Sequence, residues 1–396
     1  MNILVFSEYY YPERFLIHEI TEELVKKGHS VTVVTGKPNY NFPNGKVPVA
    51  YRKIKYEEIN GVKVYRCNVL GRGKNKIRLL LNYLSFACNA KRLSKKIANT
   101  FDVVYCYQLT PVTQLYPAIH YAKHYGIPLV CYCLDLAPLS GEKILEKLHL
   151  FRILYQKSSQ KLYNSCDKIL VTSRSFIEYL VKVNHIEKRK IGYLPQHAAD
   201  YYCVSSQDIS ANNDHVFTFL FAGNIGFGPR LENFVYSAKI LIDKGITNFR
   251  VIFVGDGSHK HALIDIVKQN ELNDYILFFD GVPSSEMQLI YQQADVLLVS
   301  LRKGQITVPG KLQAYMSTGK PILGMLDGSG KDLIAEVDCG KCVSAEDYRT
   351  FSILMEEAVL HPDSLAQKGL NGRKYYMEHF LIESHVNSLI SEFNSL

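Results

Sequence analysis

Phe249-Arg-Val-Ile-Phe-Val-Gly-Asp-Gly257 is a short apolar run that ends in a glycine–aspartate–glycine turn, and it opens the stretch that decides the fold, residues 249–326. Three further apolar runs follow at 275–282, 295–301 and 321–326, with helical patterns between them. Strands that are apolar along their whole length and joined by helices are typical of a parallel sheet covered on both faces. Ligands bind such sheets beyond the carboxyl ends of the strands. We therefore expect a binding site at the turns 255–257, 281–283 and 302–311.

The first half of the chain shows the same alternation of strands and helices. Apolar strand patterns occur at 2–7, 31–35, 102–108, 128–135, 168–173 and 191–195, and Asn60-Gly61 predicts a hairpin turn within 51–69. A polar segment over 196–215 marks a linker between the halves. A chain of 396 residues exceeds one ordinary core. The sequence predicts an α/β protein with two doubly wound parallel-sheet domains, 1–200 and 201–380, and a final helix over 381–396.

The composition is that of a globular protein, with 47% hydrophobic and 21% charged residues, and it excludes a disordered chain. The net charge of +8 favours phosphate-rich substrates, anionic lipid surfaces or nucleic acid as partners. We expect no membrane span and no signal peptide, because no run of about 18 apolar residues and no basic leader is present. Nine cysteines fit reduced thiols in a cytoplasm. Cys339-Gly-Lys-Cys342 lacks the second pair of a zinc site, and we favour a strand edge there over a redox motif.

Several motifs resemble the family-4 glycosyltransferases. Thr307-Val-Pro-Gly-Lys-Leu-Gln-Ala-Tyr-Met-Ser-Thr-Gly-Lys-Pro321 is similar to their donor-binding helix, in register with Phe253-Val-Gly-Asp-Gly257 and Ala294-Asp-Val-Leu-Leu-Val-Ser300. The opening of the chain, with Tyr10-Tyr-Pro-Glu13 and Pro38-Asn-Tyr40, resembles members that build bacterial surface polysaccharides. The resemblance implies the GT-B architecture, in which two Rossmann-like domains face a central cleft.

The resemblance also implies a reaction. This is a retaining transfer of sugar from a nucleotide-diphosphate donor to a glycan acceptor that is often lipid-linked, without a metal ion or other cofactor. A cytoplasmic enzyme that docks peripherally on the inner face of the cell membrane is expected, with no nucleic-acid partner. The turn over 223–228 lacks the acidic residue about 20 positions on that NAD binding requires, which counts against a dehydrogenase.

Donor binding is expected around a helix start and two cations. A helix start offers free N–H groups and a positive dipole end to a diphosphate, and Lys311 adds a full charge. Arg230 is the matching basic residue after the 223–228 turn, and Arg302 or Lys303 is a further candidate. Taken alone, the motif also fits an ordinary helix entry with proline in its first turn. The remaining donor-binding candidates are Asn224, Gly255, Asp256, Gly257, Val282, Pro309 and Gly310.

One departure from the family pattern affects the donor site. Many members carry two glutamates eight positions apart around the donor helix, and Ile306 and Ala314 occupy those positions here. Gln305 and Gln313 are their neighbours, and residues 327–330 are candidates for replacement contacts. Two alternatives therefore stay open: a non-catalytic partner that binds nucleotide sugar or lipid-linked glycan, and a nucleotide-sugar 2-epimerase.

Acceptor binding is expected in the first half. Asp135 ends an apolar strand, where a carboxylate can orient an acceptor hydroxyl, although it can equally cap a turn. The tryptophan of relatives nearby is Ala137 here. Arg14 stands where relatives carry a glycine-rich turn, and it either contacts phosphate or is solvated. A basic segment before the apolar helix at 79–86 either solvates a loop or docks on anionic lipid. Its residues are Arg72, Lys74, Lys76 and Arg78.

Overall fold

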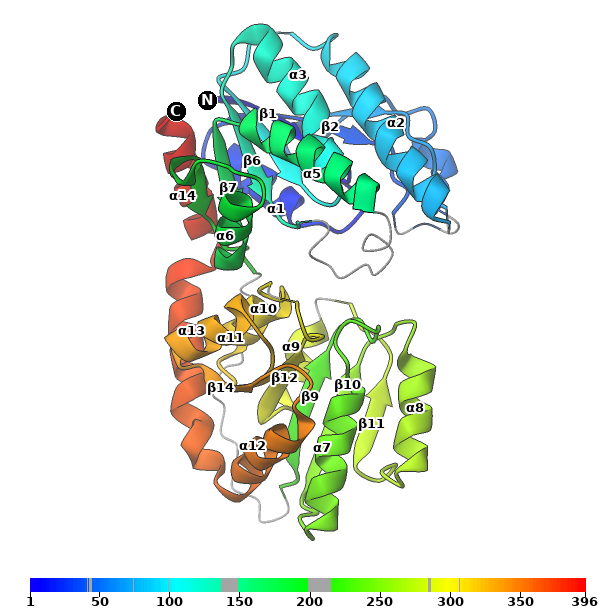
Figure 1. Ribbon diagram of the computed structural model, residues 1–396, viewed down its shortest axis with the longest axis vertical. Coiled ribbons are helices and arrows are strands. Elements are labelled where there is room, and N and C mark those ends of the chain that lie inside the picture. Colours follow the sequence, from blue (N-terminus) through cyan, green and yellow to red (C-terminus); the bar gives the residue numbers. More distant parts are fainter. Residues whose placement is uncertain are drawn as a thin grey trace. The chain divides into compact units, whose positions relative to one another are not determined.

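The structure is a computed structural model that describes residues 1–40, 42, 45–73, 75–98, 100–136, 149–198, 215–283, 286–305 and 307–396. The chain divides into two compact units, one formed by 1–195 with 382–396 and the other by 196–381. Both chain ends therefore belong to the first unit (Figure 1). Most of the polar segment expected as a linker lies outside the described residues, as do Lys74, Ala137 and Ile306.

The first unit contains a sheet in the order β3-β4-β2-β1-β5-β6-β7-β8. Its neighbouring strands are parallel except β3 and β4, which the Asn60-Gly61 turn joins as the antiparallel hairpin that the sequence predicts. Because β2 and β5 flank β1, the winding of the chain changes direction between β1 and β5. The strands are β1 (Asn2–Phe6), β2 (Ser30–Gly36), β3 (Tyr56–Ile59), β4 (Val62–Cys67), β5 (Val103–Gln108), β6 (Leu129–Cys133), β7 (Lys168–Val171) and β8 (Ile191–Tyr193).

Helices cover both faces of this first sheet (Figure 1). One face packs against α2 (Lys76–Ser94), α3 (Leu115–Tyr125), α5 (His149–Asn164) and α6 (Arg174–Lys182). The other face packs against α1 (Ile17–Lys26) and α14 (Ile382–Asn394). From the last helix, Val386, Leu389 and Phe393 enter this core. The end of the chain thus completes the core of the first unit.

The apolar periodicity of the sequence predicts a helix from about residue 14 to 27 that ends at Gly28, but the helix begins at residue 17. Residues before it form a turn in which the Phe15 ring stacks on Tyr9, with 5.2 Å between centroids, and meets Tyr40 edge-on at 5.3 Å. Tertiary packing of the Phe15 ring thus accompanies the delayed helix start. The other end agrees with the prediction, because Gly28 adopts a left-handed φ of 84° just after the helix.

The second unit contains the parallel sheet that residues 249–326 predict, in the order β11-β10-β9-β12-β13-β14. The chain starts at β9, extends to β10 and β11 on one side, and then crosses to β12, β13 and β14 on the other. The switch point therefore lies between β9 and β12. The strands are β9 (Phe217–Ala222), β10 (Phe249–Val254), β11 (Ile276–Phe279), β12 (Val296–Ser300), β13 (Ile322–Met325) and β14 (Gly340–Val343).

The second sheet is also covered on both faces (Figure 1). One face holds α7 (Glu232–Asp243), α8 (Lys260–Gln269) and α12 (Tyr348–Leu360). The other holds α9 (Met287–Gln292), α10 (Lys311–Thr318), α11 (Ser329–Val337) and α13 (Ala366–His379). Cys339 directly precedes the edge strand β14 and Cys342 lies within it, as favoured from the sequence. Burial raises the pKa of Cys339 to about 12, so its thiol is not a reactive thiolate at neutral pH.

Candidate functional site

The loops after β9 and β12 leave the second sheet side by side at its switch point. The backbone N–H of Arg302 donates a hydrogen bond to the Gly228 carbonyl at 2.9 Å. The Ser300 hydroxyl, at the end of β12, donates to the Pro229 carbonyl. These bonds tie together the two loops in which the sequence predicts donor contacts.

Glycines allow the turns after β9 and β10 to touch backbone to backbone. A Cβ atom added to Gly255, whose φ is 140°, would lie 2.0 Å from the Gly223 carbonyl oxygen. A Cβ atom added to Gly257 would lie 2.4 Å from the Ile225 oxygen and 2.5 Å from the Asn224 side chain. Both positions therefore require glycine to preserve this close packing. Asn224 itself is exposed at the edge of this surface.

Lys311 is the first residue of α10, and its side chain reaches back to the turn after β9. Its Nζ lies 3.9 Å from the centroid of the Phe221 ring. A Cβ atom added to Gly223 would lie 2.3 Å from the Cε atom of Lys311. Burial lowers the pKa of Lys311 to about 8. Within the described part of the chain no carboxylate forms an ion pair with it, so its charge is balanced only by the ring face.

Gln313, which neighbours the position of one missing glutamate, hydrogen-bonds the backbone at the start of α10. When its amide is oriented to donate, the Gln313 side-chain nitrogen lies 3.2 Å from the carbonyl oxygens of both Pro309 and Gly310. Ala314 packs against the apolar cluster beneath α10. Gln313 therefore braces the start of the helix and does not replace the missing carboxylate.

Arg230 is placed differently from Lys311. Its backbone has a left-handed φ of 53°, and its guanidinium lies 3.2 Å from Glu232 Oε1 and 3.6 Å from Glu346 Oε1. Glu346 also accepts the backbone N–H of Lys303 at 3.1 Å. The charge of Arg230 is thus shared with two carboxylates, and no contact joins it to Lys311 among the described residues. Arg230 connects the loops after β9, β12 and β14.

Asp256 joins two of the turns, 255–257 and 281–283, at which the sequence predicts a binding site. Its Oδ2 accepts the Gly281 N–H at 3.2 Å and its Oδ1 lies 3.2 Å from Lys260 Nζ. These two hydrogen bonds, the Gly281 bond first, lower the pKa of Asp256. Val282 follows directly and is half-buried. The turn after β10 therefore fixes the turn after β11.

The first sheet also has a group of polar side chains at its carboxyl edge, and Asp135 belongs to it. Asp135 is half-buried just after β6, and the Thr110 hydroxyl donates a hydrogen bond to its Oδ2. The Gln108 amide donates to the backbone oxygen of Asp135 at 3.2 Å. The predicted acceptor-side carboxylate thus lies beside the loop that follows β5.

Glu8 is a buried carboxyl group that the sequence interpretation missed. It follows β1 at the switch point and is 1% exposed. Its Oε2 accepts a hydrogen bond from the Gln114 amide at 2.9 Å, whereas Oε1 has no hydrogen-bond partner among the described residues. Burial raises the pKa of Glu8 to about 8, against the opposing charge of Arg72. The only signal in the sequence is an acidic residue directly after a fully apolar strand.

Arg72, the first residue of the basic segment expected either to solvate a loop or to dock on anionic lipid, lies in a cluster of tyrosines. Its Nη1 donates to the Tyr9 hydroxyl at 2.8 Å, and its guanidinium lies 4.4 Å from the Tyr40 ring centroid and 5.8 Å from that of Tyr83. Within the described residues no carboxylate forms an ion pair with it. Arg14 is exposed on the same loop as Phe15.

The rest of the basic segment surrounds the start of α2. Arg78 is exposed and donates through Nε to the Gly71 carbonyl at 3.2 Å. Lys74 and the side chain of Lys76 lie outside the described residues. Apolar side chains next to this segment are unusually exposed, with Ile77 74%, Leu80 50%, Leu81 46% and Leu84 43% exposed. Among the described residues, no helix has the length and apolarity needed to cross a bilayer.

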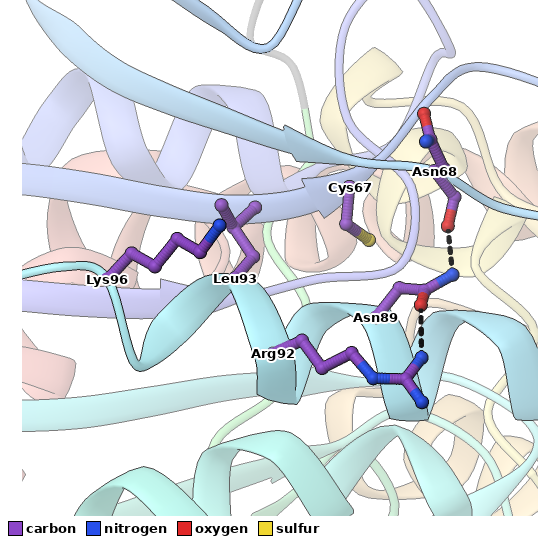
Figure 2. Close-up of a pocket in the computed structure, with 6 residues that line it drawn as sticks. All are labelled: Cys67, Asn68, Asn89, Arg92, Leu93 and Lys96. Carbon is purple, nitrogen blue, oxygen red and sulfur yellow. Dashed lines mark hydrogen bonds between the residues drawn. The ribbon is translucent and has the colours of Figure 1, made fainter.

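A separate pocket of about 220 Å³ lies between α2 and the end of β4 (Figure 2). Arg92 donates to the Asn89 side chain at 2.9 Å, and Asn89 donates to the Asn68 carbonyl at 2.8 Å. Leu93, Lys96 and Cys67 complete its lining. Asn68, Asn89 and Arg92 are thus hydrogen-bonded to one another, and none of the predicted site residues lines the pocket. Within the described ranges no group of three or more His, Cys, Asp or Glu side chains is arranged to hold a metal ion.

Comparisons with known proteins agree with this architecture. Residues 15–196 match the model of Glycosyltransferase Family 4, and residues 205–375 match that of Glycosyl transferases group 1. The chain is 25% identical over 350 residues to WcaI of Escherichia coli (strain K12), named as a colanic acid biosynthesis glycosyl transferase, covering 81% of this chain and 82% of that protein.

Solved structures share the fold at low identity. Sucrose-phosphate synthase from Thermosynechococcus elongatus superposes with a TM-score of 0.78 at 15% identity, covering 100% of this chain and 98% of that one. Anabaena HepE in complex with UDP-glucose gives 0.71 at 13% identity, with full coverage of both chains. Two adjoining family matches that together span most of the sequence, on the GT-B fold, show that this chain belongs to the glycosyltransferases built from a family 4 domain followed by a group 1 domain.

Proposed function

We propose that this glycosyltransferase transfers a sugar, with retention of anomeric configuration and without a metal ion, from a nucleoside-diphosphate donor to a lipid-linked glycan. The pathway would be the assembly of a bacterial surface polysaccharide. The name of WcaI supports the polysaccharide pathway, and the UDP-glucose complex of HepE supports a nucleotide-sugar donor.

The placement of Lys311 carries the proposal. A departing diphosphate must be stabilised by positive groups that are already in place. Lys311 supplies a half-buried cation without a carboxylate partner among the described residues, at the start of α10 and beside the turn after β9. The helix start adds N–H groups and the positive end of the helix dipole. We therefore propose that the donor diphosphate binds between Gly223 and the first turn of α10.

In the proposal, Arg230 binds the donor diphosphate in place of a carboxylate that it contacts now. In this structure it pairs with Glu232 and Glu346. A diphosphate carries more charge than either carboxylate and offers bidentate geometry to a guanidinium. We expect Arg230 to leave at least one carboxylate when donor binds, whereas Lys311 needs no exchange.

A panel of nucleotide sugars with glycan acceptors tests the function. We expect one nucleoside-diphosphate sugar to be consumed only when acceptor is present, with retained configuration by NMR and an unchanged rate in EDTA. Isomerisation of the nucleotide sugar without acceptor would indicate a 2-epimerase. Binding without turnover for every pair would indicate a non-catalytic partner. A product with inverted anomeric configuration would contradict the proposed retention. Inactivation by EDTA would contradict the proposed independence of a metal ion.

We propose that this enzyme binds its acceptor at an anionic membrane surface. The exposed apolar side chains of α2 lie beside a basic segment, a combination that favours anionic headgroups. A double change of Ile77 and Leu80 to Glu should abolish sedimentation with phosphatidylglycerol vesicles. Ile353→Glu is the matched control, because Ile353 is 56% exposed on α12 in the second unit. Equal sedimentation of all three proteins would contradict membrane docking through α2.

A further inference from the structure

A carboxyl group buried without an ion-pair partner requires an explanation, because burial of an unpaired carboxylate is unfavourable. Glu8 is such a group: it is 1% exposed, and no ion pair to it occurs among the described residues. Its backbone is held in place, since its carbonyl accepts the Gly36 N–H at 3.1 Å and the Thr35 hydroxyl at 3.2 Å. The backbone of Glu8 is therefore fixed at the switch point of the first sheet.

Gln114, whose amide hydrogen-bonds Glu8, makes further hydrogen bonds to the backbone. Gln114 is 2% exposed and ends the 3-10 turn η3 (Val112–Gln114). Its Nε2 donates to Glu8 Oε2 at 2.9 Å and to the Thr110 carbonyl at 3.3 Å, while its Oε1 accepts the Leu109 N–H at 3.2 Å. One amide side chain thus fixes the backbone of residues 109 and 110 and is anchored by Glu8.

Thr110 carries this order to Asp135. The Thr110 hydroxyl donates to Asp135 Oδ2, which leaves Oδ1 of that carboxylate outside the bond. Three strands therefore contribute to one hydrogen-bonded chain: β1 through Glu8, β5 through Thr110 and Gln114, and β6 through Asp135. Burial raises the pKa of Tyr83 on α2, and the negative charges of Glu8 and Asp135 act in the same direction.

We propose that Glu8 is a positioning residue of the acceptor site, which anchors Gln114 and, through the Leu109–Thr110 backbone and the Thr110 hydroxyl, orients Asp135 toward the acceptor hydroxyl. This inference rests on the proposed function, since it gives Asp135 the role of holding that hydroxyl. A residue that only filled space could be replaced by any side chain of similar volume. Glu8 instead acts through one specific hydrogen bond, which a glutamine can also accept.

The surroundings of Glu8 make this positioning sensitive to pH. The titratable groups that face it are Tyr9 and Glu13 on its own loop, Cys67 at the end of β4, Arg72 after β4 and Tyr83 on α2. Of these, Arg72 is the cation, and burial outweighs its effect, so the pKa of about 8 favours the protonated form of Glu8 at pH 7. Ionisation above about pH 8 places a charge in the core. An ionised carboxylate is a stronger acceptor, but the water that enters to hydrate the buried charge would compete with Gln114 for it and release the loop.

Kinetics of Glu8→Ala and Glu8→Gln test the proposal at saturating donor, because bound diphosphate keeps Lys311 charged and removes its titration from the profile. Glu8→Ala should lower kcat/KM for acceptor by about 10- to 100-fold and leave nucleoside-diphosphate binding unchanged. Glu8→Gln should restore most of the acceptor kcat/KM at pH 7 and abolish the loss of activity above pH 8. Thr21→Val is the matched control, since Thr21 makes a buried hydrogen bond to Tyr10 at 2.8 Å on α1.

A second measurement needs neither donor nor acceptor, so it separates this inference from the proposed function. Protection of the 109–114 amides against hydrogen exchange should fall above pH 8 in the wild type and in Thr21→Val, and persist in Glu8→Gln. If the wild type loses activity or amide protection above pH 8 and Glu8→Gln loses it equally, that result would overturn the proposal. So would a Glu8→Ala variant with unchanged acceptor kcat/KM. Absence of nucleoside-diphosphate binding in the wild type would overturn the proposed function, while the exchange result would still decide the role of Glu8.

Discussion

Lys311 carries its charge in a place where burial disfavours charge, and this predicts a conflict between stability and function. The folded-state pKa of about 8 lies below the ordinary value of 10.5. The folded state therefore disfavours the charged form, and the penalty is complete below pH 8 and disappears as the pH rises to 10.5. Lys311→Met should raise the free energy of unfolding at pH 7 by about 2 kcal/mol, after allowance for the lost contact with the Phe221 ring.

The same change should remove donor affinity. Calorimetry with a nucleoside diphosphate should show at least about a tenfold rise in Kd for Lys311→Met, since a desolvated charged contact is lost. Lys320→Met is the control, because Lys320 is also partly buried with a lowered pKa but follows α10 instead of starting it. A Lys311→Met protein that binds donor normally would remove Lys311 from the donor site.

Glu8 predicts a pH-dependent stability of opposite sign. Its folded-state pKa of about 8 lies above the ordinary 4.5, so the folded state holds its proton more tightly. Wild-type stability should therefore fall between pH 4.5 and 8 through this group, and Glu8→Gln should lack that slope. In denaturant titrations, the free energy of unfolding of the variant should rise relative to that of the wild type by roughly 3–5 kcal/mol between pH 4.5 and 8. Parallel curves for the two proteins would show that Glu8 is not buried as described.

Residues differ in how far their roles follow from the sequence. The place of Lys311 could be predicted, because glycine, lysine and helix pattern are adjacent in the chain. The partners of Arg230 could not, since Glu346 is distant in sequence and the pairing depends on a left-handed φ at Arg230 itself. Glu8 was missed because its meaning comes from Gln114, which only the parallel pairing of β1 with β5 brings near.

The turns after β9 and β10 are the elements on which the donor site depends most. Gly255→Ala places a methyl group against the Gly223 carbonyl in a backbone conformation that L-residues rarely adopt. We expect a loss of about 3 kcal/mol in the free energy of unfolding and at least about a tenfold weaker donor affinity. Gly126→Ala is the control: φ is also positive, at 67°, but nothing lies within 4 Å, so a loss of only about 1 kcal/mol is expected. Equal effects of both changes would contradict the close packing of the two turns.

At the element scale the strands were predicted well and some helix starts were not. β10 is confirmed where its apolar run predicts it, because strands buried on both faces read as continuous apolar sequence. The start of α1 shifted to Ile17, because packing of Phe15 against two tyrosines is a tertiary contact. The face of α2 that we assign to the membrane remains a prediction.

For the whole molecule, the chain returns to its first unit at the end. α14 places Val386, Leu389 and Phe393 in the core beside β1 and β5. Removal of residues 382–396 should destabilise the first unit by roughly 5 kcal/mol, since each of these side chains contributes about 1.5–3 kcal/mol when buried. Hydrogen exchange should locate the loss in the first sheet and spare β9–β14. Uniform exchange changes in both sheets would contradict the division into two units.

The most direct test of the central claim is a crystal structure of the enzyme with a bound nucleoside diphosphate. The account predicts the diphosphate within hydrogen-bonding distance of Lys311 Nζ and of the backbone N–H groups at the start of α10, next to Gly223. A nucleotide bound elsewhere, with Lys311 still packed only on the Phe221 ring, would contradict it.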